Sequence, residues 1–236
     1  MTEQKGVIRV LTWNIRGGIG YDGVFDLCRI VKLVQRHDPD IVAIQEVDSR
    51  GRSGGQSGPV TFLAQSLGSH VAEARTIVAP DGHYGHALIS RWPLSPPILH
   101  DISVLEREPR FAIETTATTT YGPVHLAAVH LGLKLGERRR QAAQLAEIAE
   151  SGSVVSVMLG DFNDWPWRGV VRRALAEALP ARTRHRTYPA WWPLLILDRI
   201  YCRPRQAMIR SWIDPAARRI SDHLPVIADI RIAVSH

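Results

Sequence analysis

The chain contains 236 residues, of which 45% are hydrophobic and 22% charged, with a net charge of +6 and a pI near 9.8. These values suit one large globular domain with a sizeable core, and they exclude a disordered chain or a small scaffold that depends on disulfides. The two cysteines, Cys28 and Cys202, lie beside apolar residues, so we expect buried, reduced thiols.

No targeting or membrane-spanning segment is apparent. Residues 2–6 are mostly polar, and no apolar run approaches the roughly 18 residues that a membrane-spanning helix needs. We therefore expect a cytoplasmic monomer that does not insert stably into a membrane. The excess of basic residues, most of them arginine, permits an anionic substrate, because guanidinium groups bind phosphate through paired hydrogen bonds.

The first third of the chain reads as strand, helix and strand. Residues 7–14 alternate as a strand does, and two glycines soon follow. Apolar residues at helical spacing predict a helix over 24–37, and residues 38–40 end it with a proline. A buried strand over 41–44 then runs directly towards Glu46. An acid in that position is costly unless it has a partner or belongs to a site.

The middle of the chain is rich in short strands. Residues 51–58 contain four glycines and read as a loop, and 60–67 form a short helix. Short runs of β-forming residues, separated by Gly and Pro, then predict strands over 71–78, 84–90, 98–105, 111–119 and 123–130.

The last third combines helices and strands around a polar hexapeptide. A helix over 136–150 precedes a buried strand over 153–159, which ends at Gly160 and is followed by Asp161, Asn163 and Asp164. The two-residue spacing of Asp161 and Asn163 puts both on one face of an extended segment. Further elements are a helix around 167–178, a basic and aromatic loop over 182–192, and strands over 195–201, 207–213 and 226–232.

Many short strands and few helices predict a sandwich of two sheets with helices outside. No repeat, low-complexity tract or linker divides the sequence. We therefore expect residues 1–236 to form a single domain, with a core over about 7–232.

Polar residues recur at or beside the ends of the predicted apolar strands. They are Asn14, Glu46, His130, Asp161, Asn163, Asp198, Asp222 and His223. Strand ends of adjacent sheets converge on one rim, so these side chains could share a cleft. Taken singly, each has a structural explanation, such as a turn, an ion pair or a buried core histidine. Taken together, they suit phosphoester hydrolysis with a divalent cation.

The expected roles follow from the residue types. Glu46 is a hard oxygen ligand, and Mg²⁺ typically takes one or two carboxylates together with waters and substrate phosphate. The sequence contains no Cys/His cluster at zinc spacing. His223 can act as a general base or a charged stabiliser oriented by Asp198, and His130 can donate a hydrogen bond to a phosphate oxygen.

Seven motifs in order along the chain resemble the endonuclease/exonuclease/phosphatase superfamily. They are TWNIRGG (12–18), IQEVD (44–48), GHALISR (85–91), VHLG (129–132), LGDFND (159–164), LDRIY (197–201) and SDHLPVIADI (221–230). The resemblance implies a four-layer α/β sandwich, in which two mostly antiparallel β-sheets pack face to face with helices outside, and Mg²⁺- or Mn²⁺-dependent phosphoester hydrolysis.

The resemblance also implies a role for each matching residue. Glu46 is the principal metal ligand, Asn14 supports the metal site and Asp222 borders it. Asp161 positions or deprotonates the attacking water, while Asn163 and His130 contact the phosphate. His223, paired with Asp198, is the catalytic histidine. Residues that match more loosely, as substrate-binding candidates, are His86, where relatives often have Asn, Arg91 and Arg16.

The motifs indicate a reaction but leave the substrate open. A nuclease-like phosphodiesterase is our first expectation, with backbone contacts offered by Arg16, Arg50, Arg52, Arg138–Arg140 and the 182–192 loop. A phosphatase, or a phosphodiesterase of lipids or inositol phosphates, is the alternative. Residues 191–195 would then form an apolar lip, although the same segment could be packed core. A binding module without catalysis is a third possibility, which the intact polar set argues against.

Overall fold

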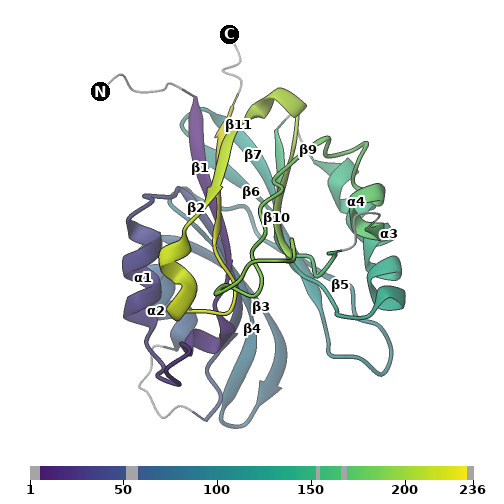
Figure 1. The fold of residues 1–236 in the computed structure, drawn as a ribbon. Helices are drawn as coiled ribbons and strands as arrows, with labels where there is room; N and C mark the ends of the chain where they lie inside the picture. The colour runs from purple at the N-terminus through teal and green to yellow at the C-terminus, as the bar shows by residue number, and fades with distance from the viewer. Residues whose placement is uncertain (1–5, 52–57, 153–154, 166–168, 233–236) are drawn as a thin grey trace.

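Residues 6–51, 58–152, 155–165 and 169–232 are described by the computed structural model of the protein (Figure 1). Two six-stranded sheets form its centre. In spatial order, the first sheet consists of β11 (Met208–Ile213), β12 (Val226–Arg231), β1 (Val7–Asn14), β2 (Ile41–Asp48), β4 (Gly82–Ser90) and β3 (His70–Ala79). The second consists of β5 (Ile98–Asp101), β6 (Phe111–Thr119), β7 (Gly122–His130), β8 (Ser156–Asp161), β10 (Asp198–Arg203) and β9 (Ala181–Arg182).

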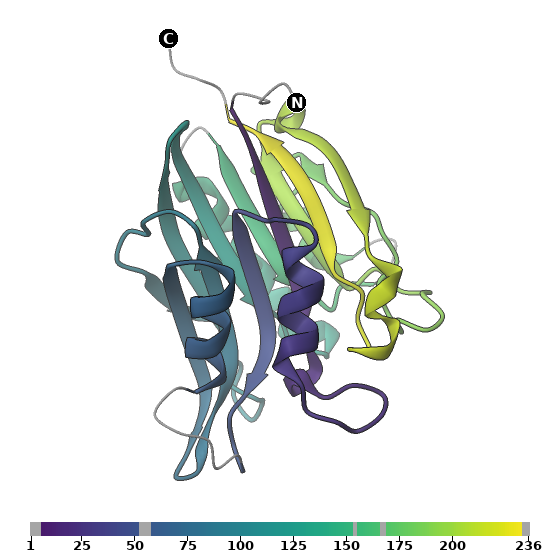
Figure 2. The same ribbon diagram turned by 90° about the vertical axis from the view of Figure 1, so that its left-hand side faces the viewer.

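Helices cover the outer face of each sheet. Helices α1 (Leu27–Gln35) and α2 (Pro59–Leu67) pack on the first sheet, as Figure 2 shows, and α3 (Leu135–Ser151) and α4 (Val170–Ala174) pack on the second. Among the described residues, ten strand pairings build the two sheets, and two of them are parallel, β1 with β2 and β7 with β8. The predicted four-layer sandwich of two mostly antiparallel sheets is therefore confirmed.

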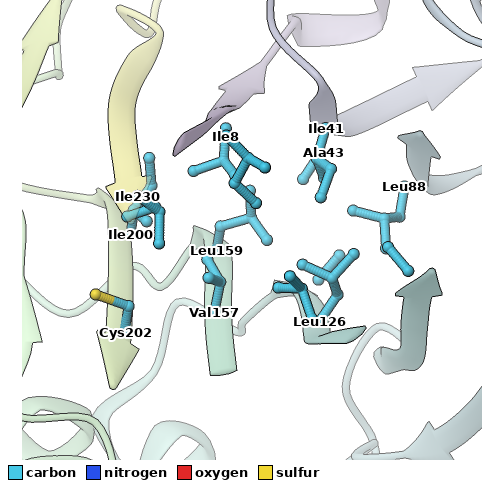
Figure 3. Close-up of a cluster of buried hydrophobic side chains, with 14 of the residues drawn as sticks. Ile8, Ile41, Ala43, Leu88, Leu126, Val157, Leu159, Ile200, Cys202 and Ile230 are labelled. Atoms are coloured by element: carbon cyan, nitrogen blue, oxygen red, sulfur yellow. The ribbon is translucent and has the colours of Figure 1, made fainter. Parts of the chain in front are cut away.

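The apolar core between the sheets follows the two-residue period of the strands. In β1, Ile8 and Val10 face the second sheet, whereas Leu11 and Trp13 face the helix layer. Figure 3 shows Ile8 meeting Leu159 of β8 in the space between the sheets. Burying each such side chain stabilises the fold by about 1.5–3 kcal/mol.

The direction of four strands decides where the site lies. Because β1 runs parallel to β2 and β7 runs parallel to β8, the carboxyl ends of each pair lie at one edge of their sheet. The two edges face each other, since Asn14 at the end of β1 is hydrogen-bonded to Asp161 at the end of β8. One rim of the sandwich therefore collects the residues that follow four buried strands.

Several predicted elements occur with different bounds. The helix predicted over 24–37 is shorter, because the Asp26 carboxylate accepts hydrogen bonds from two backbone N–H groups and caps α1 at its first residue. The strand predicted over 98–105 ends at Asp101, and the one over 195–201 begins only at Asp198. In both cases apolar composition extended the prediction beyond the paired residues.

Other predictions fall partly on residues outside the described ranges. The helix expected over 167–178 appears as the five-residue α4, and 166–168 are outside the description. Most of the 51–58 loop, including Arg52, is outside it as well. The thiols do not pair, but the prediction that both are buried was wrong for Cys28, which is exposed. Among the described residues, no helix has both the length and the apolar character needed to cross a membrane.

A buried carboxylate ties three strands of the first sheet together. Asp229 on β12 is only 3% exposed and accepts hydrogen bonds from Arg9 Nε at 2.7 Å and Arg210 Nε at 2.6 Å. Burial alone would raise the pKa of Asp229, but the hydrogen bonds from the two arginines outweigh it and lower the pKa below its ordinary value. The ionised form is therefore favoured in the folded state.

We expect Asp229→Asn to lower the free energy of unfolding at pH 7 by about 1–3 kcal/mol, because it weakens two charge-assisted hydrogen bonds. A carboxyl group with a lowered pKa stabilises the fold above its unfolded pKa and loses that effect as the pH falls through its folded pKa. The difference between variant and wild type should therefore shrink below about pH 4. Urea unfolding at several pH values measures it, and a difference that is constant with pH would contradict the assignment.

Candidate active site

Strand alternation points several of the predicted polar residues into the space between the sheets. Asn14 continues the inward face of Ile8 and Val10, and Asp161 continues that of Leu159. His130 directly opposes Asp161 in the pairing of β7 with β8. Asp198 opposes Asp161 from the other side, in the pairing of β10 with β8. The inward faces that carry the apolar core thus end in these polar residues.

Glu46 reaches the same space because of an irregularity in β2. The pairing of β2 with β4 shifts register between Ile44 and Val47, and Glu46 has a φ of 59°. A positive φ is strained for a non-glycine residue, and a β-bulge redirects the side chains that follow it. Strict alternation would turn Glu46 towards the helix layer with Ile44. The bulge instead lets Glu46 meet Asn14 while Val47 returns to the core under the helices.

Asn14 joins the acids of the two sheets. Its Nδ2 group donates to Glu46 Oε1 at 2.8 Å and to Asp161 Oδ2 at 3.1 Å. Its Oδ1 accepts a hydrogen bond from the backbone N–H of Arg16. The amide oxygen is therefore engaged with the backbone, and Asn14 fixes the positions of the two carboxylates.

His130 presents a defined nitrogen to these carboxylates. Arg110 Nη1 donates to His130 Nδ1 at 3.1 Å, so Nδ1 is the acceptor and Nε2 carries the proton. Nε2 lies 3.7 Å from Asp161 Oδ2 and 3.8 Å from Glu46 Oε1. Burial, and then the charge of Arg110, hold the pKa of His130 well below its ordinary value. The ring is therefore neutral and offers a hydrogen-bond donor.

His223 is held by a buried carboxylate. Its Nδ1 lies 2.8 Å from Asp198 Oδ2, and its Nε2 lies 3.9 Å from Asp161 Oδ2. Ser221 Oγ accepts from the backbone N–H of His223 and donates to the carbonyl of Asn14, which fixes the loop before β12 against β1. Burial alone would lower the pKa of His223, but the Asp198 carboxylate outweighs it and raises the pKa. At neutral pH this histidine is protonated.

Asp161 and Asn163 are arranged by a tight turn at the end of β8. Asp161 Oδ1 accepts from the backbone N–H of Asn163, which has a φ of 48°, and Asn163 Nδ2 donates to the carbonyl of Leu131. Burial, followed by repulsion from Asp198, raises the pKa of Asp161. The turn begins later than predicted, because Gly160 still belongs to the strand. A Cβ at Gly160 would lie 1.9 Å from the carbonyl oxygen of Val129, so glycine is required by close strand packing.

These side chains surround one pocket of about 390 Å³. Predicted residues in its wall are Glu46, His130, Asp161, Asn163, Asp222 and His223, while Asn14 and Asp198 are hydrogen-bonded to members of the wall from behind. The sequence reasoning missed three polar wall residues, which are Tyr84, Glu108 and Arg110, and it included the fourth, Tyr188, only as part of the 182–192 loop. Arg110 had the clearest signal, since it directly precedes a predicted strand, but nothing in the sequence indicated that it is buried against His130.

The three loosely matched substrate residues have different positions. Arg16 lies at the rim, where its Nε is 3.9 Å from Asp222 Oδ2. His86 is buried behind the pocket, and burial lowers its pKa to about 4, so it is neutral. Arg91 does not line the pocket: it follows the end of β4 that pairs with Ile41, at the opposite end of the sheet from Glu46, and it is bound to Asp38 and Asp40.

The residues present fit a divalent cation. Asp161, Asp198 and His223 have ligand atoms within 4.8 Å of one another, so this buried group could hold a metal. Asp198 and His223, however, are already engaged with each other. Glu46 lines the pocket, and burial raises its pKa above the ordinary value, which shows that its charge is incompletely compensated. A hard cation beside Glu46 would supply that compensation.

Comparison with known proteins identifies the family. The sequence model of the endonuclease/exonuclease/phosphatase family matches residues 11–223. The chain belongs to this family. Its members generally hydrolyse phosphoester bonds and generally depend on a divalent metal. The match includes all eight of the predicted polar residues, from Asn14 to His223.

Individual relatives extend the family assignment. The chain is 33% identical to the uncharacterized protein YbhP of Escherichia coli K12, over 97% of this chain and 98% of YbhP. A family structure from Beutenbergia cavernae has a TM-score of 0.80 at 22% identity, covering 97% of this chain and 72% of that one. The 3′ phosphatase NExo from Neisseria, solved with a product DNA hairpin, has a TM-score of 0.65 at 18% identity, covering 94% and 99%.

Glu46→Gln tests whether the Glu46 carboxylate lowers the free energy of unfolding. A carboxyl group whose pKa is raised by burial destabilises the fold at pH values above its folded pKa, and this penalty is absent below its unfolded pKa. The variant keeps an oxygen to accept from Asn14. We therefore expect its free energy of unfolding at pH 7 in EDTA to rise by about 1 kcal/mol. Chemical denaturation measures this, and a loss of stability would indicate that Glu46 is compensated within the protein.

Arg110→Met tests how His130 is held. Without the Arg110 donor, the proton is no longer confined to Nε2, so both tautomers of His130 should appear in ¹⁵N-edited ring spectra. Hydrolytic activity should fall about 10- to 100-fold, as for other residues that orient a functional histidine. Arg107→Met, which removes an exposed arginine from the same loop, is the control. A single Nε2–H tautomer in Arg110→Met would contradict the positioning role.

Proposed function

We propose that this protein is a Mg²⁺- or Mn²⁺-dependent phosphodiesterase with nuclease-like activity. The observation that carries the proposal is the meeting of Glu46, Asp161, His130 and His223 in one pocket, although they come from four separate parts of the chain. NExo, which shares this fold, was solved with a product DNA hairpin, and this supports nucleic acid as the substrate class.

Asp161 acts on the attacking water, and the protonated His223 acts on the phosphate. Asp161, whose pKa is raised by burial, orients the water and accepts its proton, because a base with a pKa nearer neutrality is better matched to this transfer. His223, kept protonated by Asp198, stabilises the negative charge that develops on the phosphate oxygens. His130 and Asn163 line the same pocket and donate to the phosphate through Nε2 and Nδ2.

Glu46 would be the principal ligand of the cation, with Asp222 at its border. When bound, the cation neutralises charge on the phosphate and polarises the phosphorus for attack. Asn14 supports the metal site by holding Glu46 and Asp161 at fixed separation, because its Nδ2 group donates to both carboxylates.

A second candidate function is hydrolysis of a phosphodiester in a lipid headgroup. The segment that was expected either to form an apolar lip or to be packed core is exposed: Trp191 is 63%, Trp192 62% and Leu194 53% exposed. Large exposed apolar side chains beside a polar pocket are typical of binding to a membrane surface or a partner. Leu195 lies in the pocket wall, so this segment adjoins the candidate active site.

A binding module without catalysis agrees less well with the local energetics. Glu46 occupies a strained backbone position, and the pKa values of both Glu46 and Asp161 are raised by burial. Strain and buried charge each cost free energy and concentrate at functional sites. A scaffold that only binds would be stabilised by losing them.

Turnover of bis(p-nitrophenyl) phosphate tests the proposed reaction. We expect hydrolysis with Mg²⁺ or Mn²⁺ and none in EDTA. His223→Ala should lower kcat by about 10²–10⁴-fold, because it removes the charged stabiliser, and Asp198→Asn should lower it less. Far-ultraviolet circular dichroism checks that both variants are folded.

His70→Ala is the matched control, because His70 lies on the outer strand β3 and is not part of the pocket. It should retain wild-type kcat. Metal-independent turnover, or full activity in His223→Ala, would reject the proposed mechanism. A parallel assay on DNA, RNA, inositol phosphates and sphingomyelin vesicles separates the first candidate function from the second.

A further inference from the structure

A second pocket, of about 470 Å³, adjoins the candidate active site and is lined mainly by arginine. Its arginines come from α4, from β9 and the loop that follows, and from β10. They are Arg172, Arg182, Arg184, Arg186 and Arg199, and Trp165, Leu194 and Ile196 complete the wall. None of these arginines is used by the proposed reaction. The pocket therefore needs an explanation of its own.

The positive charge of this pocket is poorly balanced. Within the part of the chain that the structure describes, none of the five arginines has a carboxylate oxygen within ion-pair distance. The neighbouring acid, Asp164, is 3.8 Å from Arg138 and accepts from the backbone N–H of Arg172. Burial, and then repulsion from Arg184, lower the pKa of Arg182. Five guanidinium groups around one hollow form a strong anion-binding environment.

Two of the arginines have a buried Nε group without a hydrogen-bond partner. Arg199 is only 4% exposed, and its Nη2 donates to the carbonyls of Asp164 and Ile196, which fixes the side chain. The Nε groups of Arg199 and Arg182 are buried and have no hydrogen-bond partner. An unpaired buried donor is unfavourable by about 1–3 kcal/mol. A bound anion would contribute oxygen acceptors to this group of guanidinium side chains.

Trp165 connects the two pockets. It lines both of them and is 55% exposed, so one ring borders the candidate active site and the arginine pocket at once. Bases of single-stranded nucleic acid stack on such exposed aromatic rings, and backbone phosphates bind to the basic groups beside them. The order of features is thus phosphate site, aromatic ring and second anion site.

We propose that Arg172, Arg182, Arg184, Arg186 and Arg199 form a second phosphate-binding subsite for a single-stranded polynucleotide. The scissile phosphodiester lies in the active-site pocket, a neighbouring phosphate lies among the arginines, and the base between them stacks on Trp165. This inference rests on the proposed function and specifies its substrate class. A lipid with a single headgroup phosphate would leave the arginine pocket without an anion.

The test compares substrates that differ by one phosphate. The first is a thymidine dinucleotide with one phosphodiester, and the others are the same dinucleotide with an added 5′- or 3′-terminal phosphate. For one of the two phosphorylated forms, the wild-type kcat/KM should be about 10- to 100-fold higher than for the unphosphorylated dinucleotide. Charge-assisted hydrogen bonds to the added phosphate account for a gain of this size. Arg184→Gln/Arg186→Gln should lose most of this advantage and keep the wild-type rate on the unphosphorylated dinucleotide.

The variant and its control are both expected to fold. Arg184 and Arg186 are exposed, and the control pair Arg36→Gln/Arg231→Gln removes the same charge from exposed positions that line neither pocket. The control should keep the full preference for the added phosphate. Trp165→Ala should weaken cleavage of longer single strands by a larger factor than it lowers bis(p-nitrophenyl) phosphate turnover.

Binding measurements in EDTA separate the inference from the function on which it rests. Binding of a fluorescent thymidine octanucleotide in EDTA reports the subsite without turnover. If no diester is hydrolysed but Arg184→Gln/Arg186→Gln weakens this binding at least tenfold, the subsite stands and the proposed function falls. Equal effects of the variant and control pairs would overturn the subsite. The subsite would also be overturned if Arg184→Gln/Arg186→Gln weakened binding to phospholipid vesicles but not to the octanucleotide. The arginines would then belong to a membrane-binding surface.

Discussion

The amide of Asn14 is the interaction on which the candidate site depends. One NH₂ group, at the end of β1, donates to Glu46 of the same sheet and to Asp161 of the facing sheet. Two carboxylates from different sheets repel each other in a buried site, and the shared donor offsets part of that repulsion. The position of the amide is in turn set by the backbone N–H of Arg16 and, through the carbonyl of Asn14, by Ser221. The rim of the sandwich is therefore fixed at its centre by hydrogen bonds.

The surrounding groups form two electrostatic pairs that have different consequences. Both histidines are buried, so burial alone would leave both neutral. Burial, and then the charge of Arg110, keep His130 neutral, and the hydrogen bond from Arg110 confines its proton to Nε2. Asp198 outweighs burial at His223 and keeps it protonated, so a neutral donor and a charged donor lie near Asp161.

Much of the fold was predictable because it follows from local rules. Alternation predicted the strands β1 and β8, and a short run of β-forming residues predicted β7. These strands end at Asn14, His130 and Asp161, and the layer order followed from strand and helix content. Glu46 was identified as a candidate site residue, but the bulge that turns its side chain inward has no sequence signal beyond the acid itself. Arg91 shows the limit of motif matching. Its neighbours in β4 fit the family pattern, yet antiparallel pairing carries the end of that strand away from the pocket.

Residues that contact partners distant in sequence could not be found in this way. Arg110 bonds to a histidine 20 residues away, and the arginine pocket combines α4 with β9, β10 and the loop after β9. Composition indicated only that the 182–192 segment is basic and aromatic. In the structure the basic and aromatic residues lie apart: Arg184 and Arg186 are in the wall of a pocket, and Trp191 and Trp192 are exposed outside it. The polar rim lies within the region that matches the family, residues 11–223, and carries the reaction that we propose. The segment after β9 is a loop, and loops that a rigid scaffold positions commonly carry binding residues, so in our proposal this loop governs the choice of substrate.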